Sequence, residues 1–408
     1  METGTALPIA IFALTYYVIG AGKLPWMRLD RTGAALAGAV AMVVVGGLGE
    51  RAAVAAIDFP TLGLLLGMMV IAAHLRLSGA LDAAGRVLLT RSRSGFGMLA
   101  MTIAVAGVLA AFFINDVVCL ALTPLLIEFT AIAGAPPVPF LLALATASNI
   151  GSAATITGNP QNMIVAGFAH LPYGAFAIRL APAAAAGLVI DYAVIAWIYR
   201  KELARVRCAD AAIRPARGSP WYRAKSAAIA LGVLAGFAIG YRPDLVALSA
   251  GAISLFTRRV KPARVYRLID WTMLLMFAGL FVVVAGLERT GLPGALVNAI
   301  GPARLANTAI LATAVAALSN LVSNVPGVML MRPIYPALAS NHAAALIIAG
   351  VSTLAGNLTI LGSIANLIVV EQARRARIEI GFGEYLRVGV PVTILSLVIG
   401  VALIAAGL

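Results

Sequence analysis

The sequence predicts an all-α polytopic membrane protein that consists of two halves related as an inverted repeat. Three observations support this prediction: the composition is unusually apolar, apolar segments follow one another along the whole chain, and the same polar landmarks occur once in each half. Hydrophobic residues make up 62% of the 408 residues, and charged residues make up 11%. Soluble domains are typically about 45–50% apolar and about 25% charged, so this chain has too little charge to cover a soluble surface.

The apolar segments outnumber the full membrane spans that the composition allows. A span needs roughly 20 apolar residues, so the chain has enough for at most about a dozen. We therefore expect about ten transmembrane helices, two of them broken, plus two re-entrant hairpins at 97–134 and 305–340. In the alternative topology every hairpin arm spans fully. In chain order, the apolar segments are 6–20, 32–47, 60–75, 97–114, 117–134, 138–170, 174–199, 224–240, 243–257, 269–287, 305–322, 325–339, 343–371 and 388–407.

Polar landmarks divide the chain into a first membrane repeat at 1–199, a basic cytoplasmic linker at 200–225 and a second, inverted repeat at 226–408. Shared Ser, Thr, Gly and Asn residues in register rarely arise by chance in apolar helices, so they indicate a duplication. The matching stretches are Ile57-Asp58 with Ile269-Asp270, Asn115-Asp116-Val117 with Ser323-Asn324-Val325, and Ser148 plus TITGNPQNMIV at 155–165 with Ser352 plus TILGSIANLIV at 359–369.

The distribution of basic residues indicates that the two copies are inverted. Loops that are basic in one half correspond to loops with few basic residues in the other, so equivalent loops lie on opposite sides of the membrane. By the positive-inside rule the basic loops are cytoplasmic. This assignment predicts a multi-pass protein of the cytoplasmic (inner) membrane with both termini outside. The loops predicted to be cytoplasmic are 21–31, 76–95, 200–225, 258–268 and 372–387.

Each half contains an apolar segment that polar and helix-breaking residues interrupt. Irregular backbone at membrane depth is tolerated only against protein or a wet cavity, and half-helix ends present free N–H or C=O groups to a solute. We expect the two breaks and the two hairpin tips to meet near the midplane in one site. Close packing is the alternative explanation for the glycines. The candidate substrate- and ion-binding residues are Asn115, Asp116, Ser148, Asn149, Thr155, Gly158, Asn159, Asn162, Ser323, Asn324, Asn357, Thr359, Gly362 and Asn366.

Three ionisable residues in apolar segments are candidates for particular roles. A carboxylate at membrane depth is costly, so we expect Asp116 to face a cavity or a partner and to couple transport to protons; capping of the returning helix is the alternative. Asp191 is either a second proton site or a member of an ion pair. Arg332 is either a contact for an anion or a side chain that extends to the outer surface.

Several classes of function are excluded or disfavoured. The net charge of +14 lies in short clusters between apolar runs, which fits orientation in the membrane and not nucleic-acid binding. Cys119 and Cys208 have no metal-site or disulfide spacing, so we expect no metal and no cofactor beyond a coupling Na⁺ or H⁺. The sequence has no HExxH, GxSxG or Walker motif. The chain is therefore not expected to be an enzyme, and uphill transport would use an ion gradient or a separate ATPase subunit.

Four stretches resemble the ion-transporter superfamily, which includes arsenite pumps, divalent-anion and citrate symporters, and related sodium/proton antiporters. They are FFINDVVCLALTPLLI at 112–127, SNIGSAATITGNPQNMIV at 148–165, SNLVSNVPGVML at 319–330 and STLAGNLTILGSIANLIV at 352–369. The Asn115-Asp116 tip, followed by Leu-Thr-Pro at 122–124, is most similar to the arsenite-pump branch. Both tips depart from the Ser-Asn-Thr pattern of the divalent-anion branch. The resemblance implies a scaffold and a transport domain in each half, elevator-like alternating access and a homodimer.

These observations lead to three hypotheses. The first is a secondary active transporter that moves a small inorganic or organic anion, coupled to H⁺ or Na⁺, with efflux of the arsenite or antimonite type as one form. The second is a Na⁺/H⁺ antiporter of the same superfamily, in which Asp116 exchanges the two ions. The third is a channel or a non-transporting membrane scaffold. For the first two, the expected partners are the small anion or ion, the lipid bilayer and a second copy of the chain.

Overall fold

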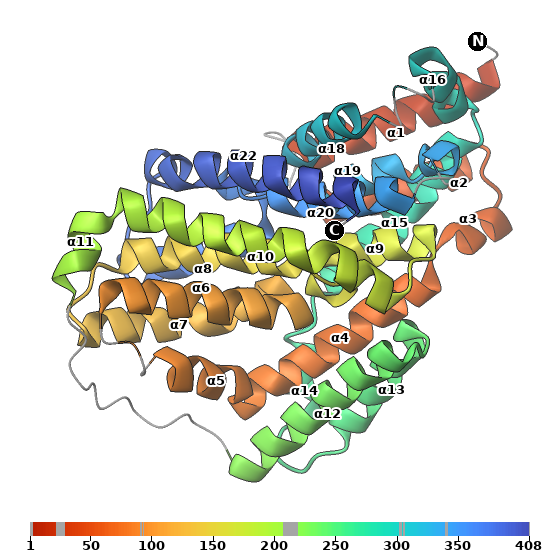
Figure 1. Ribbon diagram of the computed structural model, residues 1–408. Coiled ribbons are helices and arrows are strands. Elements are labelled where there is room, and N and C mark those ends of the chain that lie inside the picture. Colours follow the sequence, from red (N-terminus) through yellow and green to blue (C-terminus); the bar gives the residue numbers. More distant parts are fainter. Residues whose placement is uncertain are drawn as a thin grey trace.

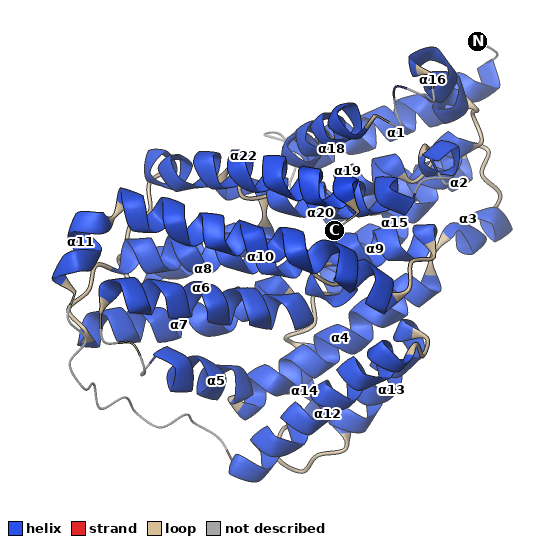
Figure 2. Ribbon diagram, in the orientation of Figure 1, coloured by secondary structure: helices blue, strands red, loops and turns tan. Residues whose placement is uncertain are grey.

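The computed structural model describes residues 3–21, 29–89, 92, 94–206, 219–301, 304, 307–338 and 342–407. Within these ranges all regular elements are helices, joined mostly by short loops (Figure 2). In this part of the chain, 7 helices are long and apolar enough to cross a membrane on their own, and several shorter apolar helices accompany them. The predicted all-α polytopic fold is confirmed.

The first half contains six apolar helices or helix pairs in chain order, with the short helices α3 and α5 between them and α11 after the last. Its elements are α1 (Thr3–Ala21), α2 (Arg31–Val44), α3 (Glu50–Ala56), α4 (Phe59–Ser78), α5 (Ala80–Leu89), α6 (Gly95–Phe112), α7 (Asn115–Ile132), α8 (Pro137–Ser152), η1 (Ile156–Gly158), α9 (Pro160–Ala169), α10 (Tyr173–Ile198) and α11 (Arg200–Arg205).

The second half repeats this order, except that η2 follows α19 and that the described residues contain no counterpart of α11. Its elements are α12 (Pro220–Ile239), α13 (Pro243–Leu255), α14 (Pro262–Tyr266), α15 (Trp271–Glu288), α16 (Leu292–Ile300), α18 (Thr308–Val322), α19 (Asn324–Met331), η2 (Tyr335–Leu338), α20 (His342–Ala355), η3 (Ile360–Gly362), α21 (Ile364–Arg375) and α22 (Phe382–Ala406). Helix α12 begins at Pro220, so the last residues of the predicted linker are helical, whereas 207–218 lie outside the described residues.

The helices form two groups, which we call the scaffold and the bundle (Figure 1). The scaffold consists of α1, α2, α4, α12, α13 and α15. Within it, helices of one repeat pack on helices of the other: α4 packs on α13, and α2 packs on α15. The bundle consists of α6 to α10 and α18 to α22, with α10 of one half lying along α22 of the other.

Small residues fix the pairing within the scaffold in the same way in both halves. A Cβ atom on Gly67 of α4 would collide with the backbone of Ala247 on α13. The repeat-related Gly279 of α15 stands against the backbone of Ala35 on α2, where a Cβ would lie 2.8 Å from its carbonyl. Close backbone approach through small residues is the usual way for helices to pack in lipid. The predicted inverted duplication is therefore visible in the packing.

The two hairpins end at the depth of the two helix breaks. Asn115, at the tip between α6 and α7, donates from Nδ2 to Asn149 Oδ1 at 2.8 Å, and Thr155 in the first break donates to the carbonyl of Ala111. In the second half, Asn320 Nδ2 near the tip between α18 and α19 donates to the carbonyl of Ala355 at 3.1 Å. Helices α6 and α7 are long enough to span, but their tip lies inside the protein. This buried tip is what a re-entrant hairpin requires, and the re-entrant topology stays a prediction.

Candidate functional site

The unwound backbone in each broken helix is held by the same amide in each half. Asn162 Nδ2 donates to the carbonyls of Ser152 at 3.0 Å and Thr155 at 2.8 Å. Its repeat mate, Asn366, donates to the carbonyls of Gly356 at 2.9 Å and Thr359 at 3.1 Å. Backbone groups freed by a helix break need such partners in an apolar surrounding. These two amides therefore make the breaks possible.

A second pair of equivalent hydrogen bonds joins the two breaks to each other. Ser363 Oγ donates to Asn149 Oδ1 at 2.9 Å, and in the mirrored arrangement Asn159 Nδ2 donates to Thr353 Oγ1 at 3.1 Å. Asn149 also donates to Asn357 Oδ1 at 2.8 Å and to the side chain of Asn366 at 3.0 Å. The halves are thus connected through a buried polar network at the centre of the bundle.

Most of the candidate residues in the breaks belong to this buried polar network and do not line the central cavity. Their side chains or backbones support the polar network, and their direct contact with a solute remains a prediction. A Cβ on Gly158 would collide with the Ser152 carbonyl, and one on Gly362 would lie 2.7 Å from the Gly356 carbonyl. The candidates that do not line the cavity described next are Ser148, Asn149, Thr155, Gly158, Asn159, Asn162, Asn357, Thr359, Gly362 and Asn366.

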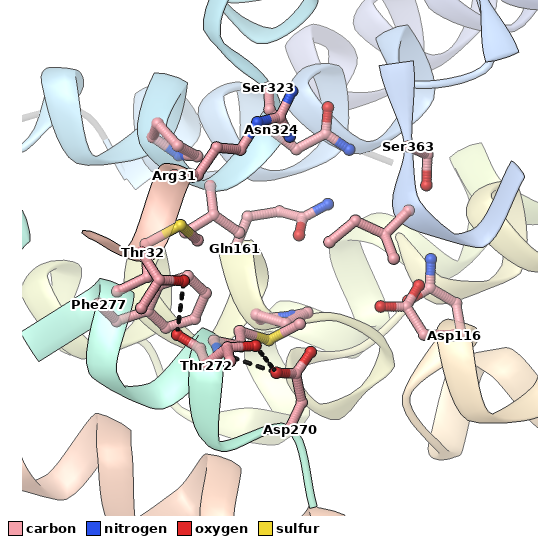
Figure 3. Close-up of a pocket in the computed structure, with 17 residues that line it drawn as sticks. Arg31, Thr32, Asp116, Gln161, Asp270, Thr272, Phe277, Ser323, Asn324 and Ser363 are labelled. Carbon is pink, nitrogen blue, oxygen red and sulfur yellow. Dashed lines mark hydrogen bonds between the residues drawn. The ribbon is translucent and has the colours of Figure 1, made fainter. Parts of the chain in front are cut away.

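A cavity of about 170 Å³ lies between the bundle and the scaffold, and all four tip residues line it (Figure 3). The bundle contributes both hairpin tips and the starts of α9 and α21, whereas the scaffold contributes the starts of α2 and α15. The polar lining residues are Arg31, Thr32, Asn115, Asp116, Gln161, Asp270, Thr272, Ser323, Asn324 and Ser363. The structure therefore brings Asn115, Asp116, Ser323 and Asn324 together, as predicted for the tips.

Four bundle helices begin at this cavity: α7, α9, α19 and α21. No side chain caps the start of α7 or α19, whereas Asn159 and Ser363 cap α9 and α21. Uncapped first-turn N–H groups and the helix dipole favour oxygen atoms of a ligand. Ser323, between α18 and α19, has φ of 80°, in a region that favours glycine. Such strain in a non-glycine residue often marks a functional site.

Asn324 and Asp116 occupy equivalent places at the two tips but have different surroundings. With its amide nitrogen toward Ser319, Asn324 donates to the Gly362 carbonyl at 3.0 Å and the Ser352 carbonyl at 3.2 Å. Asp116 is half-buried and faces the cavity (Figure 3). Among the described lining residues, those with charged side chains are Arg31, Asp116 and Asp270. The cavity therefore combines two carboxylates and one guanidinium with neutral hydroxyls and amides.

Sequence reasoning missed the scaffold side of the cavity. Asp270 caps α15 by accepting from Met273 N at 2.9 Å, and Thr272 donates its hydroxyl to the same carboxylate. The signal was available, because Asp270 belongs to one of the repeated landmarks. For Gln161 and Ser363 the signal was the polar run at each break. Arg31 is the last residue of the basic loop predicted at 21–31, and nothing in the sequence separated it from the residues that orient the chain.

The other two ionisable candidates lie away from the cavity. The Arg332 guanidinium stacks 5.3 Å from the centre of the Phe281 ring and donates to the Ala56 carbonyl at 3.5 Å, so it joins the end of the second hairpin to the scaffold. Asp191 is fully buried in α10, and among the described residues neither of its oxygens has a hydrogen-bond partner. In the repeat, LVI at 188–190 matches LVI at 397–399, which aligns Asp191 with Gly400.

We expect Asp191→Asn to stabilise the protein, because the variant keeps the shape of the side chain and cannot carry an unpaired charge in the core. The expected gain in the free energy of unfolding is about 1 kcal/mol. Thermal unfolding in detergent at pH 8, followed by tryptophan fluorescence, measures it. A lower melting temperature would contradict this expectation and would mean that the Asp191 carboxyl binds a partner in the folded protein.

The architecture defines the class of protein. Two broken helices and two hairpins, related by an inverted repeat, surround one small polar cavity between two helical groups, which is the arrangement of a membrane transporter. The chain belongs to the citrate transporter family: the family model described as "Citrate transporter" (CitMHS) matches residues 24–349. The predicted place in the ion-transporter superfamily is confirmed.

The relatives cover nearly the whole chain. The silicon efflux transporter LSI3 of Oryza sativa subsp. japonica is 32% identical, and the match covers 94% of each chain. The putative transporter arsB of Dictyostelium discoideum is 24% identical, with 93% of this chain and 88% of the relative covered. The crystal structure of the Alcanivorax borkumensis YdaH transporter has the same fold, with a TM-score of 0.63 at 17% identity, over 99% of this chain and 98% of that chain.

Proposed function

We propose that this membrane transporter exports a small uncharged hydroxide of the silicic-acid or arsenous-acid kind in exchange for protons. The observation that supports this proposal is the combination, in one small cavity, of carboxylates with uncapped helix N-termini. In this proposal the end of the molecule with the basic loops faces the cytoplasm. The similarity to a silicon efflux transporter supports the same substrate class.

The size of the cavity is sufficient for a small solute. A volume of about 170 Å³ is well above the roughly 10–15 Å³ that one water molecule needs, so the cavity can hold a small solute. A central atom with three or four hydroxyl groups fits this space. The polar groups of the cavity, and not its volume, distinguish this solute from an organic anion such as citrate.

The polar groups of the cavity complement a hydroxide better than an anion. The first-turn N–H groups of α7 and α19 suit the oxygen lone pairs of the solute. The carboxylates of Asp116 and Asp270 accept hydrogen bonds, and O–H groups of the solute provide the donors. A fully ionised anion has no such donors, and the two carboxylates that would repel it outnumber the one guanidinium, Arg31, that would attract it. This complementarity favours an uncharged acid at neutral pH.

Transport in proteoliposomes tests the proposal. With solute inside and a more acidic medium outside, we expect saturable efflux of silicic acid or arsenous acid, and no competition by citrate. Flux of citrate would overturn the proposed substrate class. Efflux at the same rate with and without the pH gradient would overturn proton coupling. Single-channel currents would show that the protein is a channel and not a carrier.

A Na⁺/H⁺ antiporter is the second candidate, because two carboxylates in one cavity also suit a small cation. The same vesicles distinguish the two. An antiporter releases protons when Na⁺ is added in the absence of silicic or arsenous acid, whereas the proposed exporter shows no response to Na⁺ alone.

A further inference from the structure

The scaffold carries two carboxylates in equivalent positions. Asp58 precedes α4 and Asp270 precedes α15, 212 residues later. Their backbone angles nearly coincide, with φ −79° and ψ 83° for Asp58 and φ −81° and ψ 82° for Asp270. Each accepts a hydrogen bond from a backbone N–H three residues later and from a threonine hydroxyl in the same turn. The inverted repeat places them toward opposite faces of the membrane.

The two carboxylates line two different spaces between scaffold and bundle. Asp270 lines the central cavity together with both hairpin tips (Figure 3). Asp58 lines a larger crevice of about 840 Å³, whose other charged or titratable lining residues are His170, Arg242, Asp244, Glu288 and Arg332. None of the four tip residues lines that crevice. In this structure the hairpin tips therefore lie beside Asp270, at one of two equivalent places on the scaffold. The other place, beside Asp58, faces the crevice and has no tip residue next to it.

The inverted repeat predicts a second conformation, in which the cavity opens to the other face of the membrane. Exchanging the roles of the two halves moves both tips from the position of Asp270 to the position of Asp58, which is how inverted repeats generate alternating access. In both states Asp116 of the bundle then faces a scaffold carboxylate. In the present state the charged residues of the shared cavity are Arg31, Asp116 and Asp270, so one guanidinium accompanies two carboxylates.

Other charged groups near α7 are engaged elsewhere. Arg86 of α5 pairs with Glu128, at the far end of α7, at 2.9 Å and with Asp82 at 3.0 Å. On α21, Glu371 pairs with Arg374 and Arg375, beyond the break. His74 of α4 contacts the hydroxyl of Tyr222 at 2.7 Å. Helices α6 and α8 have no charged residue. Arg76 of α4, which also packs on α7, does not line the cavity. The charged residues that share the cavity with Asp116 are therefore Asp270 and Arg31.

We propose that Asp270 and Asp58 are matched positioning residues that make the docking of the bundle at each face depend on the proton carried by Asp116. Two ionised carboxylates repel each other strongly in a confined cavity. Docking at either position is favoured when Asp116 carries a proton, and release of that proton weakens docking. This inference rests on the proposed proton-coupled transport and adds the residues that link the proton to the position of the bundle.

Side-specific pH profiles of silicic acid flux in oriented proteoliposomes test the inference. We expect Asp270→Asn to lower the pH of half-maximal flux on the cytoplasmic side by about one pH unit, the size of effect that a neighbouring like charge produces, and to leave the outer profile unchanged. Asp58→Asn should lower the outer midpoint alone. Asparagine is as good an N-cap as aspartate, and Asp270→Ser provides a second capping variant.

The matched control is Asp30→Asn. Asp30 caps α2 by accepting from Gly33 N at 2.7 Å and does not line the cavity, so both of its profiles should match the wild type. Unchanged profiles in Asp58→Asn and Asp270→Asn, or equal shifts on both sides, would overturn the inference while leaving proton-driven flux intact. Wild-type protein without proton-driven flux would instead overturn the proposed function.

Discussion

Asp116→Asn is expected to abolish proton-driven accumulation while leaving passive exchange of the solute in place. The variant keeps the size and shape of the side chain and removes its ability to bind and release a proton. Asparagine is also the residue that the repeat has at the equivalent tip, in Asn324, so the hairpin should tolerate it. A positioned proton-transfer group typically contributes a factor of 10²–10⁴, so we expect uphill flux to fall by about 100-fold or more.

Two measurements on the same vesicles check this result. Accumulation against a solute gradient, driven by a pH difference, should be lost, and exchange of labelled solute at equal concentrations should stay within several-fold of the wild type. Glu128→Gln is the matched control, because Glu128 lies on the same helix, pairs with Arg86 at 2.9 Å and does not line the cavity. Proton-driven accumulation that persists in Asp116→Asn would assign the proton to another group.

The sequence was sufficient to predict the architecture because the polar landmarks occur in places where lipid-exposed backbone is not allowed. Pro160 and Gly158 in mid-segment require a break, and the matching stretch in the second half requires the same break there. The hairpin tips follow from Asn115-Asp116 and its counterpart. Length alone would have assigned full spans to α6 and α7, since both are long enough to cross.

The cavity could be predicted only in part, because 7 of its 17 lining residues come from the scaffold helices α2 and α15 and the turns before them. The bundle residues at the tips were recognisable as polar interruptions. Asp270 and Arg31 resemble ordinary helix-start and loop residues, and their role appears only when α2 and α15 are packed against the bundle. The amide groups of Asn149 and Asn162 are buried in the network behind the cavity, and their predicted contact with a solute stays a prediction.

Asn149→Leu is expected to prevent the bundle from assembling. The Asn149 amide accepts from Asn115 at 2.8 Å and from Ser363 at 2.9 Å, and it donates to Asn357 at 2.8 Å and to Asn366 at 3.0 Å. Leucine leaves all four partners without this contact in a fully buried position. Each unsatisfied buried group costs about 1–3 kcal/mol, so the loss of stability should reach about 4 kcal/mol or more.

The free energy lost in Asn149→Leu should appear as poor recovery of monodisperse protein and as a melting temperature well below that of the wild type. Thr102→Val is the matched control: Thr102 is equally buried in α6, and its hydroxyl donates only within its own helix, to the Met98 carbonyl at 2.8 Å. That control should change stability by about 1 kcal/mol or less. If Asn149→Leu were as stable as Thr102→Val, the two breaks would not depend on this amide. Apolar packing alone would then hold the two halves together. The equivalent hydrogen bond from Asn159 to Thr353 would likewise not be needed to join the two breaks.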